Sequence, residues 1–568
     1  MKTNLILKNF DLVSQGADGV PKLRQAILRL AVEGKLVSQN PNSNSKDFIS
    51  IIREKRSRLM RDRKIIEKNE LEPITEKEKP YLLPNGWEFL RLGGIALKLG
   101  AGSTPLGGKK VYVNHGVKFL RSQNVWNDGL YLTDVAYIDE KVHEDMDGTW
   151  VKPKDILLNI TGASIGRSCV VPDEFDTANV SQHVAIVRLV EPELRWFLHL
   201  YVISPVFQKM IDDAEVGVSR EGLSMGKLKK FVIPVPPVEE QKRIVAKVDQ
   251  LMALCNELEA GQEKQTHIRQ QLNDAALNDL LFATTTEEFE KSWQRIVDNF
   301  DCLYDDRENF QSLRQTILQM AIRGKLVQQN ESDEPVDQMF SRVVEEKRMH
   351  NRITSKDLQK NGSCETLGYE LPVNWRWRTL EDILIFGPTN GFSPKAVEYE
   401  TPVRSLTLTA TTSGKFKPEH TKFISNNISK DSGLWLRDGD ILVQRGNSIE
   451  YVGVSAVYRG KPYQFIYPDL MMKLRISKEM NVDFVHLTMN SEPCRNFLRE
   501  RASGTSGSMP KINQTTLKSL PLPIPPVVEQ NRIVDKVNQL MALCDELEKR
   551  LVAKSSHVEK ITETLMRV

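Results

Sequence analysis

Hydrophobic residues recur every three or four positions in two long stretches of the chain. They step by four, three, four and three residues, with charged residues between them, which is the spacing of a coiled-coil seam. The first seam consists of Ile244, Val248, Leu251, Cys255 and Leu258. The second seam consists of Ile533, Val537, Leu540, Cys544 and Leu547. We therefore predict two long helices, the first from Val238 to Leu281 and about 65 Å long at 1.5 Å per residue.

The two seams belong to a repeat that covers most of the chain. The segment KLRQAILRLAVEGKLVSQN at 22–40 returns as SLRQTILQMAIRGKLVQQN at 312–330. Leu23 and Leu313 are 290 residues apart, Trp87 and Trp375 are 288 apart, and Pro234 and Pro523 are 289 apart. A period this long indicates two copies of a whole domain with its helix. The intervening inserts, at 98–230 and 386–519, show little similarity to each other, so one scaffold is expected to present two different surfaces.

Two equivalent seams in one chain can pair with each other. We expect an antiparallel pair, because a domain and a long connection separate the two helices. The pair would form a rigid spacer with one globular insert at each end, related by a pseudo-twofold axis. Gly261 interrupts the first pattern at a cost of about 1 kcal/mol relative to alanine, which allows a kink there.

A shorter amphipathic helix is predicted before each insert, and in the first copy it stops at Gly34. The stretches that follow, 46–80 and 333–365, are highly charged. Such runs are usually solvated helix faces or connections, and a DNA-contacting arm is the alternative.

Each insert begins after an LPxxW motif, whose tryptophan is expected to anchor the core, with base stacking as the alternative. β-Branched runs such as 155–162 and 440–446 are bounded by Gly, Pro, Asn and Asp and predict short strands. Helical stretches follow at 195–211 and 482–501. Each insert is therefore predicted to be an α+β domain dominated by twisted sheet.

Composition narrows the class of protein. A chain of 568 residues suggests roughly three to four domains. The net charge of +3 means that nucleic-acid binding would depend on local basic faces. The six cysteines never form CxxC and have no nearby histidine at zinc spacing, so reduced core thiols and no metal site are expected. Without a signal sequence or a run of 18 apolar residues, a cytoplasmic protein is expected.

Catalytic motifs are missing from the sequence. The stretch from Gly102 to Lys110 nearly matches a P-loop, but Gly108 stands where lysine is required, so a plain loop is predicted. The Asn/Asp-Pro-Pro-Tyr/Phe tetrapeptide that an adenine methyltransferase uses to stack a flipped base is absent. His183 is expected to pack or to face DNA and not to bind a metal.

The ordered motifs LRQxILxxAxxGKLV, LPxxW, DIL with a Gly-rich turn, and PxPPxxEQxRIVxKVxxLMALCxEL occur twice. This arrangement resembles the specificity (HsdS) subunits of type I restriction-modification enzymes over essentially the whole chain. The resemblance implies a non-catalytic subunit whose two target recognition domains each read one half of a split DNA sequence. It also implies two methyltransferase (HsdM) partners and restriction/motor (HsdR) subunits. S-adenosylmethionine, ATP and Mg are then expected on the partners and none on this chain.

The fold class expected on this basis is α+β, with two mixed, β-rich recognition domains separated by long conserved helices that form an antiparallel coiled-coil spacer. We expect helical regions at 1–80 and 238–370, recognition domains at 81–237 and 371–526, and a last spacer helix at 527–568.

The DIL strand and its turn are similar to a feature common to the family. The second copy departs from the first, because Ile165-Gly166 becomes Ile449-Glu450 and Gly453 comes later. The two turns are therefore predicted to differ in backbone.

Direct readout of DNA uses polar side chains on loops that reach base edges. Arg121 could pair with O6 and N7 of guanine, and Gln123 or Asn124 could read adenine, with plain solvent exposure as the alternative for each. The candidates in the first insert are Ser103, Thr104, Arg121, Ser122, Gln123, Asn124, Thr161, Ser164, Arg167, Ser219 and Arg220. Those in the second are Asn390, Arg404, Ser405, Gln444, Arg445, Asn447, Ser448, Ser506, Lys511 and Asn513.

Two other functions stay open at this point. A helical adaptor could use the two inserts to bind proteins and no DNA, and a stand-alone restriction enzyme is disfavoured by the missing motifs. A DNA reader differs from an adaptor because its binding to a specific duplex falls steeply with salt.

Overall fold

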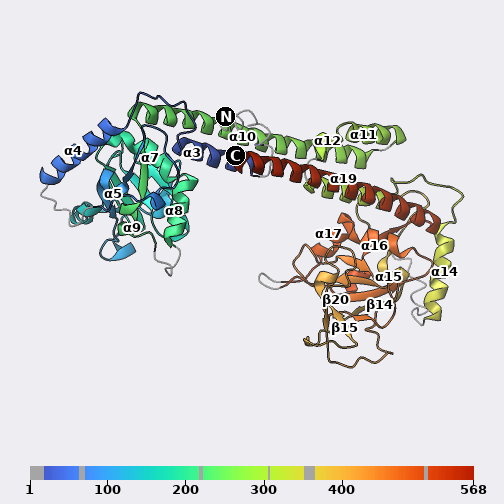
Figure 1. The fold of residues 1–568 in the computed structure, drawn as a ribbon. Coiled ribbons are helices and arrows are strands. Elements are labelled where there is room, and N and C mark those ends of the chain that lie inside the picture. The colour runs from blue at the N-terminus through green and yellow to red at the C-terminus, as the bar shows by residue number, and fades with distance from the viewer. Residues whose placement is uncertain are drawn as a thin grey trace. The chain divides into compact units, whose positions relative to one another are not determined.

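The computed structural model of the chain describes Ser14 and residues 18–62, 71–215, 222–283, 285–304, 307–350, 365–504 and 509–567. The chain forms two compact units, the first from residues 1–265 with 554–568 and the second from 266–553. Each unit contains an α+β domain packed against helices (Figure 1).

The first unit contains short strands and mostly short helices. Its helices are α3 (Gly19–Val32), α4 (Lys46–Asp62), α5 (Leu92–Ile95), α6 (Glu140–Asp145), α7 (Arg195–Val202), α8 (Pro205–Glu215) and α9 (Met225–Lys230). Its strands are β1 (Glu88–Arg91), β2 (Ala96–Ala101), β3 (Val117–Leu120), β4 (Val125–Trp126), β5 (Gly129–Leu130), β6 (Ala136–Ile138), β7 (Trp150–Val151), β8 (Ile156–Asn159), β9 (Ser168–Val170), β10 (Ala178–Val180), β11 (Val184–Leu189) and β12 (Val232–Val235).

The second unit has a matching set of elements and additional helices. Its helices are α11 (Thr286–Asp298), α12 (Phe300–Leu303), α13 (Arg307–Ile322), α14 (Val336–Met349), α15 (Leu380–Ile383), α16 (Val482–Asn490), α17 (Glu492–Glu500) and α18 (Gln514–Lys518). Its strands are β13 (Arg376–Thr379), β14 (Leu384–Asn390), β15 (Arg404–Leu406), β16 (Thr421–Phe423), β17 (Ile441–Gln444), β18 (Ser455–Val457), β19 (Phe465–Ile466), β20 (Met471–Ile476) and β21 (Pro521–Ile524).

The two α+β domains share one sheet topology, although their sequences look unlike. The order β2-β11-β8-β9 in the first corresponds to β14-β20-β17-β18 in the second, and β6-β3-β10 corresponds to β16-β15-β19. The parallel pairing of β10 with β3 recurs as β19 with β15. Strand β7 and the β4-β5 hairpin occur only in the first domain among the described residues. The prediction of two β-rich α+β domains is confirmed.

The aspartate of each DIL motif comes directly before a strand and is buried. Asp155 is buried and accepts hydrogen bonds from Nε and Nη2 of Arg188, both at 2.7 Å. Asp440 accepts one from Nη2 of Arg475 at 2.5 Å. Each arginine lies on the strand that pairs with the DIL strand, so this charge pair is a shared structural element. In the second domain burial lowers the pKa of the neighbouring Lys473 to about 8.

Two long helices, α10 (Val238–Phe282) and α19 (Val527–Arg567), contribute residues to both units. The observed bounds of α10 agree with the heptad prediction. The helix is continuous through Gly261, where the sequence allowed a kink. These helices confirm the predicted helical spacer between the two domains.

The seam residues of each long helix pack inside their own unit. Ile244 of α10 shares one hydrophobic core with Leu23 of α3, and Ile533 of α19 shares another with Leu313 of α13. The other seam residues lie in or against the same cores: Val248, Leu251, Cys255 and Leu258 in the first, and Val537, Leu540, Cys544 and Leu547 in the second. The expected partner was the other seam; the structure instead buries each seam against the short helix of its own repeat. A heptad pattern specifies a buried face but not what covers it.

Polar contacts show the relative direction of α3 and α10 in the first unit. Arg24 of α3 donates to Oδ1 of Asn256 at 2.6 Å and to Oε2 of Glu259 at 2.8 Å. Beyond the end of α3, the carbonyl of Ser38 accepts a hydrogen bond from Arg243 near the start of α10. The two helices therefore run antiparallel.

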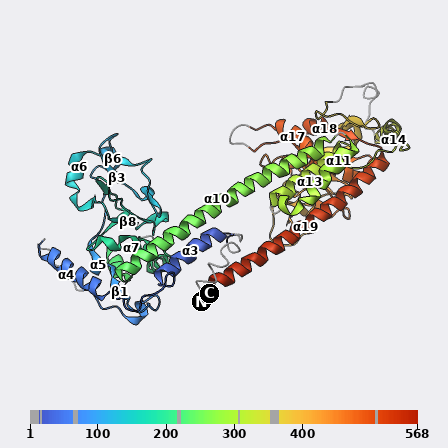
Figure 2. The same cartoon turned by 90° about the horizontal axis from the view of Figure 1, so that it is seen from above.

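The second unit has the equivalent pair, α13 with α19, and the end of α10 and the helix α11 also pack on it (Figure 2). Arg314 of α13 donates to Asp545 at 2.7 Å and to Glu548 at 2.8 Å on α19. The end of α10 and the helix α11 join the same core through Leu280 and Ile296, which are both buried. The last turns of α10 are thus held by hydrophobic packing.

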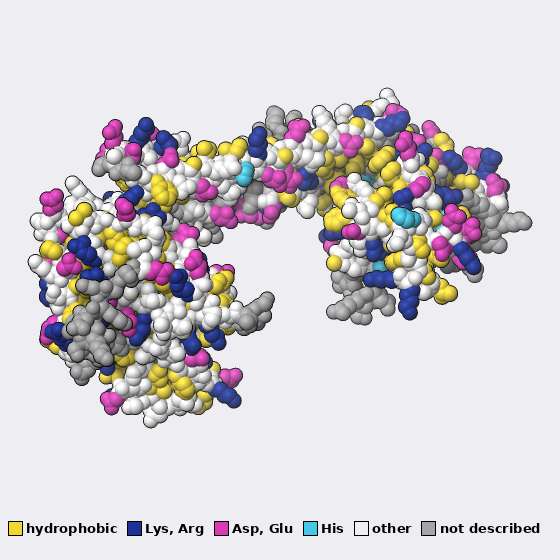
Figure 3. Space-filling view, turned by 180° about the vertical axis from the view of Figure 1, so that it is seen from behind, with side chains coloured by type: hydrophobic (Ala, Val, Ile, Leu, Met, Phe, Trp, Pro, Cys, Tyr) yellow, Lys and Arg dark blue, Asp and Glu magenta, His cyan; other side chains and the backbone are white. Residues whose placement is uncertain are grey.

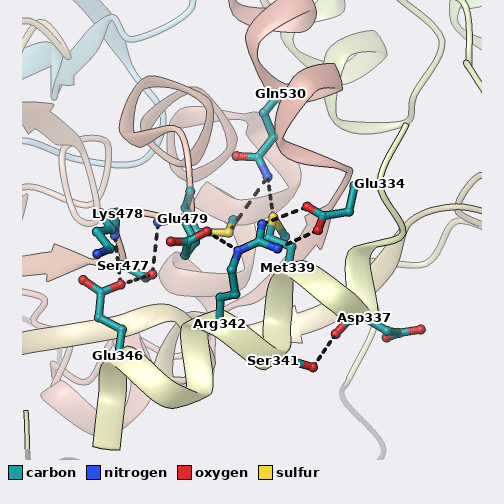
Figure 4. Close-up of polar contacts among 11 residues, drawn as sticks. Glu334, Asp337, Met339, Ser341, Arg342, Glu346, Ser477, Lys478, Glu479 and Gln530 are labelled. Atoms are coloured by element: carbon teal, nitrogen blue, oxygen red, sulfur yellow. Dashed lines mark hydrogen bonds and ion pairs between the residues drawn. The ribbon is translucent and has the colours of Figure 1, made fainter. Parts of the chain in front are cut away.

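The charged stretch after α13 folds onto the second α+β domain (Figure 4). Arg342 of α14 donates to both carboxylate oxygens of Glu334, at 2.6 and 2.8 Å, and to Glu479 at 2.6 Å. One turn further, Glu346 accepts hydrogen bonds from Ser477 and from the backbone of Lys478. The described part of this stretch, α14, is therefore a helix that packs on the domain by one face, with its other face exposed.

Three repeated motifs meet at a buried glutamate in the second unit. Glu529, in the first turn of α19, is 1% exposed. Its Oε1 accepts hydrogen bonds from Nε2 of Gln329 at 2.6 Å and from the indole of Trp375 at 3.1 Å. Burial raises the pKa of Glu529. The tryptophan thus anchors the core, as predicted for the LPxxW motif.

In the first unit the equivalent side chains lie near one another, but Nε1 of Trp87 and Oε1 of Glu240 have no hydrogen-bond partner among the described residues. Burial raises the pKa of Glu240 in the first turn of α10, and the neighbouring Trp87 and Gln39 side chains oppose that rise. We call Gln39, Trp87 and Glu240 in the first unit, and Gln329, Trp375 and Glu529 in the second, the glutamate junctions.

Glu529→Gln should remove a pH dependence of stability. Because the folded pKa lies above the ordinary value of 4.5, the native state binds the proton more tightly than the unfolded state. The contribution of this carboxyl to the free energy of unfolding therefore falls as pH rises from about 4.5 through the raised pKa. Denaturant unfolding of both proteins between pH 4 and 8 should show the stability difference moving in favour of the variant as pH rises. Parallel curves would contradict this, and Glu546→Gln, at an exposed site on the same helix, is the control.

Candidate nucleic-acid interface

Several loops of the first α+β domain gather at one edge, where β2, β3, β8 and β10 end and β11 begins. Backbone hydrogen bonds tie these loops together. The amide of Gly102 donates to the carbonyl of Val184 at 2.9 Å, and Ser103 donates to Val180 at 3.1 Å. Residues 102–104, 121–124, 160–164 and 181–183 constitute this first loop edge.

The second domain has the same hydrogen-bond frame. The amide of Gly391 donates to the carbonyl of Met471 at 3.2 Å, and Phe392 donates to Tyr467 at 2.9 Å. Residues 390–393, 444–448, 468–470 and 511–513 constitute the second loop edge.

A second pair of contacts confirms the equivalence of the two edges. Ile160 accepts a backbone hydrogen bond from Leu223 at 2.8 Å, and Arg445 accepts one from Ile512 at 2.9 Å. Ile160 and Arg445 each follow the last residue of a DIL strand. The chain therefore uses one backbone frame twice, with different side chains.

Close packing requires glycine at one position of each frame. A Cβ atom on Gly102 would lie 2.0 Å from the carbonyl oxygen of Val180, and one on Gly391 would lie 2.1 Å from that of Tyr467. Both distances are far below van der Waals contact with backbone atoms, so any side chain would displace the loop.

The turns after the two DIL strands differ in length but close in the same way. Gly166 donates to the carbonyl of Asn159 at 2.9 Å, and Gly453 donates to that of Gln444 at 2.8 Å. The closing glycine follows the strand end by seven residues in the first domain and by nine in the second. The predicted difference in backbone is confirmed.

Buried amides hold the loops from beneath. Asn159 Nδ2 donates to the carbonyl of Ser122 at 2.9 Å and to Ser164 at 3.2 Å. Gln444 Nε2 donates to the carbonyl of Leu408 at 3.1 Å. These contacts bring the predicted candidates around Ser122 and Ser164 together.

Three predicted readers are buried and are removed from the candidates. Asn124 is 1% exposed and its amide donates to the carbonyl of Tyr131, while Ser405 and Gln444 are fully buried. Their side chains form hydrogen bonds inside the domain. A polar side chain in a loop can serve as a hydrogen-bond partner of the backbone and then does not contact a ligand.

Other predicted readers reach the surface of the first domain. Ser103, Thr104 and Gln123 are exposed. Arg121, Ser122, Thr161, Ser164 and Arg167 are half-buried. Arg121 donates to the carbonyl of Asp134, and the guanidinium of Arg167 lies 4.0 Å from the ring centroid of Trp126.

In the second domain Asn390, Arg404, Ser448, Lys511 and Asn513 are exposed, and Arg445 and Asn447 are half-buried. Arg404 begins β15 and so lies away from the second loop edge. Asn513 caps α18 by accepting a hydrogen bond from the amide of Thr516. Ser219, Arg220 and Ser506 lie outside the described residues.

Two exposed edge residues were missed in the sequence. Gln182 lies on the first loop edge and Asp469 on the second. Both stand in loops just before the strand that pairs with the DIL strand, β11 or β20. Their equivalence depends on non-local hydrogen bonds, and the segments around them, VSQHV and YPDLM, show no similarity that would reveal it in the sequence.

Charge is mixed over the surface. On the face seen in Figure 3, basic and acidic side chains are interspersed on both units. In the part of the chain that the structure describes, no group of three or more His, Cys, Asp or Glu side chains could hold a metal ion. Within those same residues no helix is long and apolar enough to cross a membrane.

A sequence model of the type I restriction modification DNA specificity domain matches residues 84–266 and 372–554, which together exceed half of the chain. The chain belongs to this family. It is a non-catalytic specificity subunit of a type I restriction-modification system, with two DNA specificity domains. The adaptor alternative has no support from these comparisons.

Relatives and solved structures match over most of the chain. It is 27% identical over 556 residues to the EcoEI specificity subunit of Escherichia coli, covering 94% of this chain and 91% of that one. It is 27% identical over 555 residues to the EcoAI specificity subunit of Escherichia coli, covering 93% and 90%. The HsdS subunit from Thermoanaerobacter tengcongensis is 18% identical with a TM-score of 0.41, over 86% of this chain and 98% of that one.

Gly102→Ala should impair DNA discrimination by the first domain only. The new methyl group would overlap the carbonyl of Val180 and displace the loop, at a cost of about 1 to 3 kcal/mol. Gly100→Ala is the matched control, because its Cβ would meet nothing within 4 Å. Competition binding with singly substituted duplexes should show weakened discrimination in one half of the target for Gly102→Ala and none for the control. Equal behaviour of the two variants would contradict the role of this close approach.

Proposed function

We propose that the chain reads a bipartite, asymmetric DNA target, with one loop edge for each half-site. The observation that carries this proposal is the duplicated backbone frame. A shared frame presents the same backbone to each half-site, whereas the exposed side chains differ between the two edges. Two different sequences can then be read by two copies of one fold.

The loop edges have suitable chemistry for base contacts. Hydroxyl and amide side chains such as Ser103, Gln123 and Asn390 are exposed there. They can both donate and accept hydrogen bonds at base edges. Lys109 and Lys110, exposed just beyond the first loop edge, and Lys511 on the second can neutralise phosphates. We propose the recognition domains as 81–237 and 371–526.

The long helices supply a surface for the other subunits of the complex. Leu254 and Leu543 occupy equivalent places on α10 and α19 and are 43% and 47% exposed. Exposed leucines on a helix are suited to packing against partner helices. We propose that each repeat recruits one methyltransferase (HsdM) subunit, with restriction (HsdR) subunits joining the assembly in the cytoplasm. S-adenosylmethionine, ATP and Mg would then bind those partners.

The salt dependence of binding tests the DNA-reading function directly. The full chain with its methyltransferase partner should bind its methylated motif more weakly as salt rises, and that motif should consist of two separated half-sites. Lys109→Gln with Lys110→Gln should reduce the slope of log K against log salt by about 1.8 if both lysines contact phosphate. Lys229→Gln with Lys230→Gln, at the end of α9 beside Gly93, is the control and should leave the slope unchanged. A salt-independent affinity or an undivided motif would refute the proposal.

A further inference from the structure

Gln182 and Asp469 hold the same place in the two loop edges. Gln182 comes two residues after Val180, whose carbonyl accepts the amide of Ser103. Asp469 comes two residues after Tyr467, whose carbonyl accepts the amide of Phe392. Both side chains are exposed. Their positions are set by equivalent backbone hydrogen bonds and not by sequence similarity.

A hydroxyl group orients each of these side chains. Thr104, two residues after Gly102, donates to Oε1 of Gln182. In the second domain Ser393, two residues after Gly391, donates to Oδ1 of Asp469. The serine hydroxyl also accepts a hydrogen bond from the amide of Asp469 at 3.1 Å. The hydroxyl is therefore a shared positioning group.

The hydrogen-bonding groups that remain for contact with DNA differ between Gln182 and Asp469. In Gln182 the amide nitrogen can still donate, and Oε1 keeps one lone pair. Asp469 keeps a carboxylate oxygen that can only accept, and among the described residues its side chain is bonded to the hydroxyl of Ser393 and to no Lys or Arg. An unpaired carboxylate close to DNA is repelled by phosphates, so its presence on a reading edge requires a compensating contact.

Base chemistry supplies that contact. A glutamine can accept from N6 and donate to N7 of adenine in the major groove, and an aspartate can accept from N4 of cytosine. We propose that Gln182 and Asp469 are specificity-determining residues, with Gln182 reading an adenine in one half-site and Asp469 a cytosine in the other. Thr104 and Ser393 position them. This inference rests on the proposed DNA-reading function and names the bases recognised at one place of each edge.

Selection from a randomised duplex pool by the full chain with its methyltransferase partner tests the assignment. Asp469→Asn should change one position of one half-site from cytosine to adenine, because an amide replaces the carboxylate. Gln182→Glu should change one position of the other half-site from adenine to cytosine. The preferred base at each altered position should lose about 5- to 150-fold in relative affinity. Each variant serves as the control for the half-site that it leaves unchanged.

Further variants separate readout from folding. Thr104→Val and Ser393→Ala should weaken discrimination at the same single positions without selecting a new base. Asp431→Asn, an exposed carboxyl elsewhere in the second domain, should leave the motif as it is. A wild-type selection that returns no bipartite motif would refute the proposed function itself. In a different outcome the wild-type protein selects a bipartite motif, while Asp469→Asn and Gln182→Glu leave that motif unchanged or weaken binding to all sequences equally. That result would overturn the assignment of Gln182 and Asp469 and leave the proposed function standing.

Discussion

A buried glutamate at the start of each long helix lies among the segments that the chain repeats. In the second unit Glu529 accepts hydrogen bonds from Gln329, which follows the short helix, and from Trp375, which opens the α+β domain. A buried charged or polar group without partners is costly, so these three motifs must stay together. The glutamate junction thereby fixes the domain on its helices. This physical requirement explains why the three motifs recur at nearly constant offsets.

At the two loop edges the exposed side chains can change without disturbing the backbone. The loop edges are held by backbone hydrogen bonds, by one glycine in each copy and by buried amides beneath them. These contacts do not depend on the exposed side chains. Thr104 with Gln182, and Ser393 with Asp469, can therefore differ while the frame remains the same.

Much of the fold follows from the sequence because its periodicity is strong. The heptads predict α10 almost to the residue, and the β-branched runs predict the DIL strands. The partner of each seam was not predictable, since periodicity identifies a buried face and not its neighbour. The same limit affects the reading residues. Asn124 and Gln444 have the right chemistry but are buried, whereas Gln182 and Asp469 become recognisable only through contacts made across the sheet.

The central claim is that one frame, used twice with different side chains, reads two half-sites. It is tested most directly by replacing residues 386–519 with a second copy of residues 98–230 and determining the methylated motif in cells that contain the methyltransferase partner. The account predicts a motif in which the half-site of the first domain occurs twice. Retention of the original asymmetric motif would contradict it, because specificity would then reside outside the inserts.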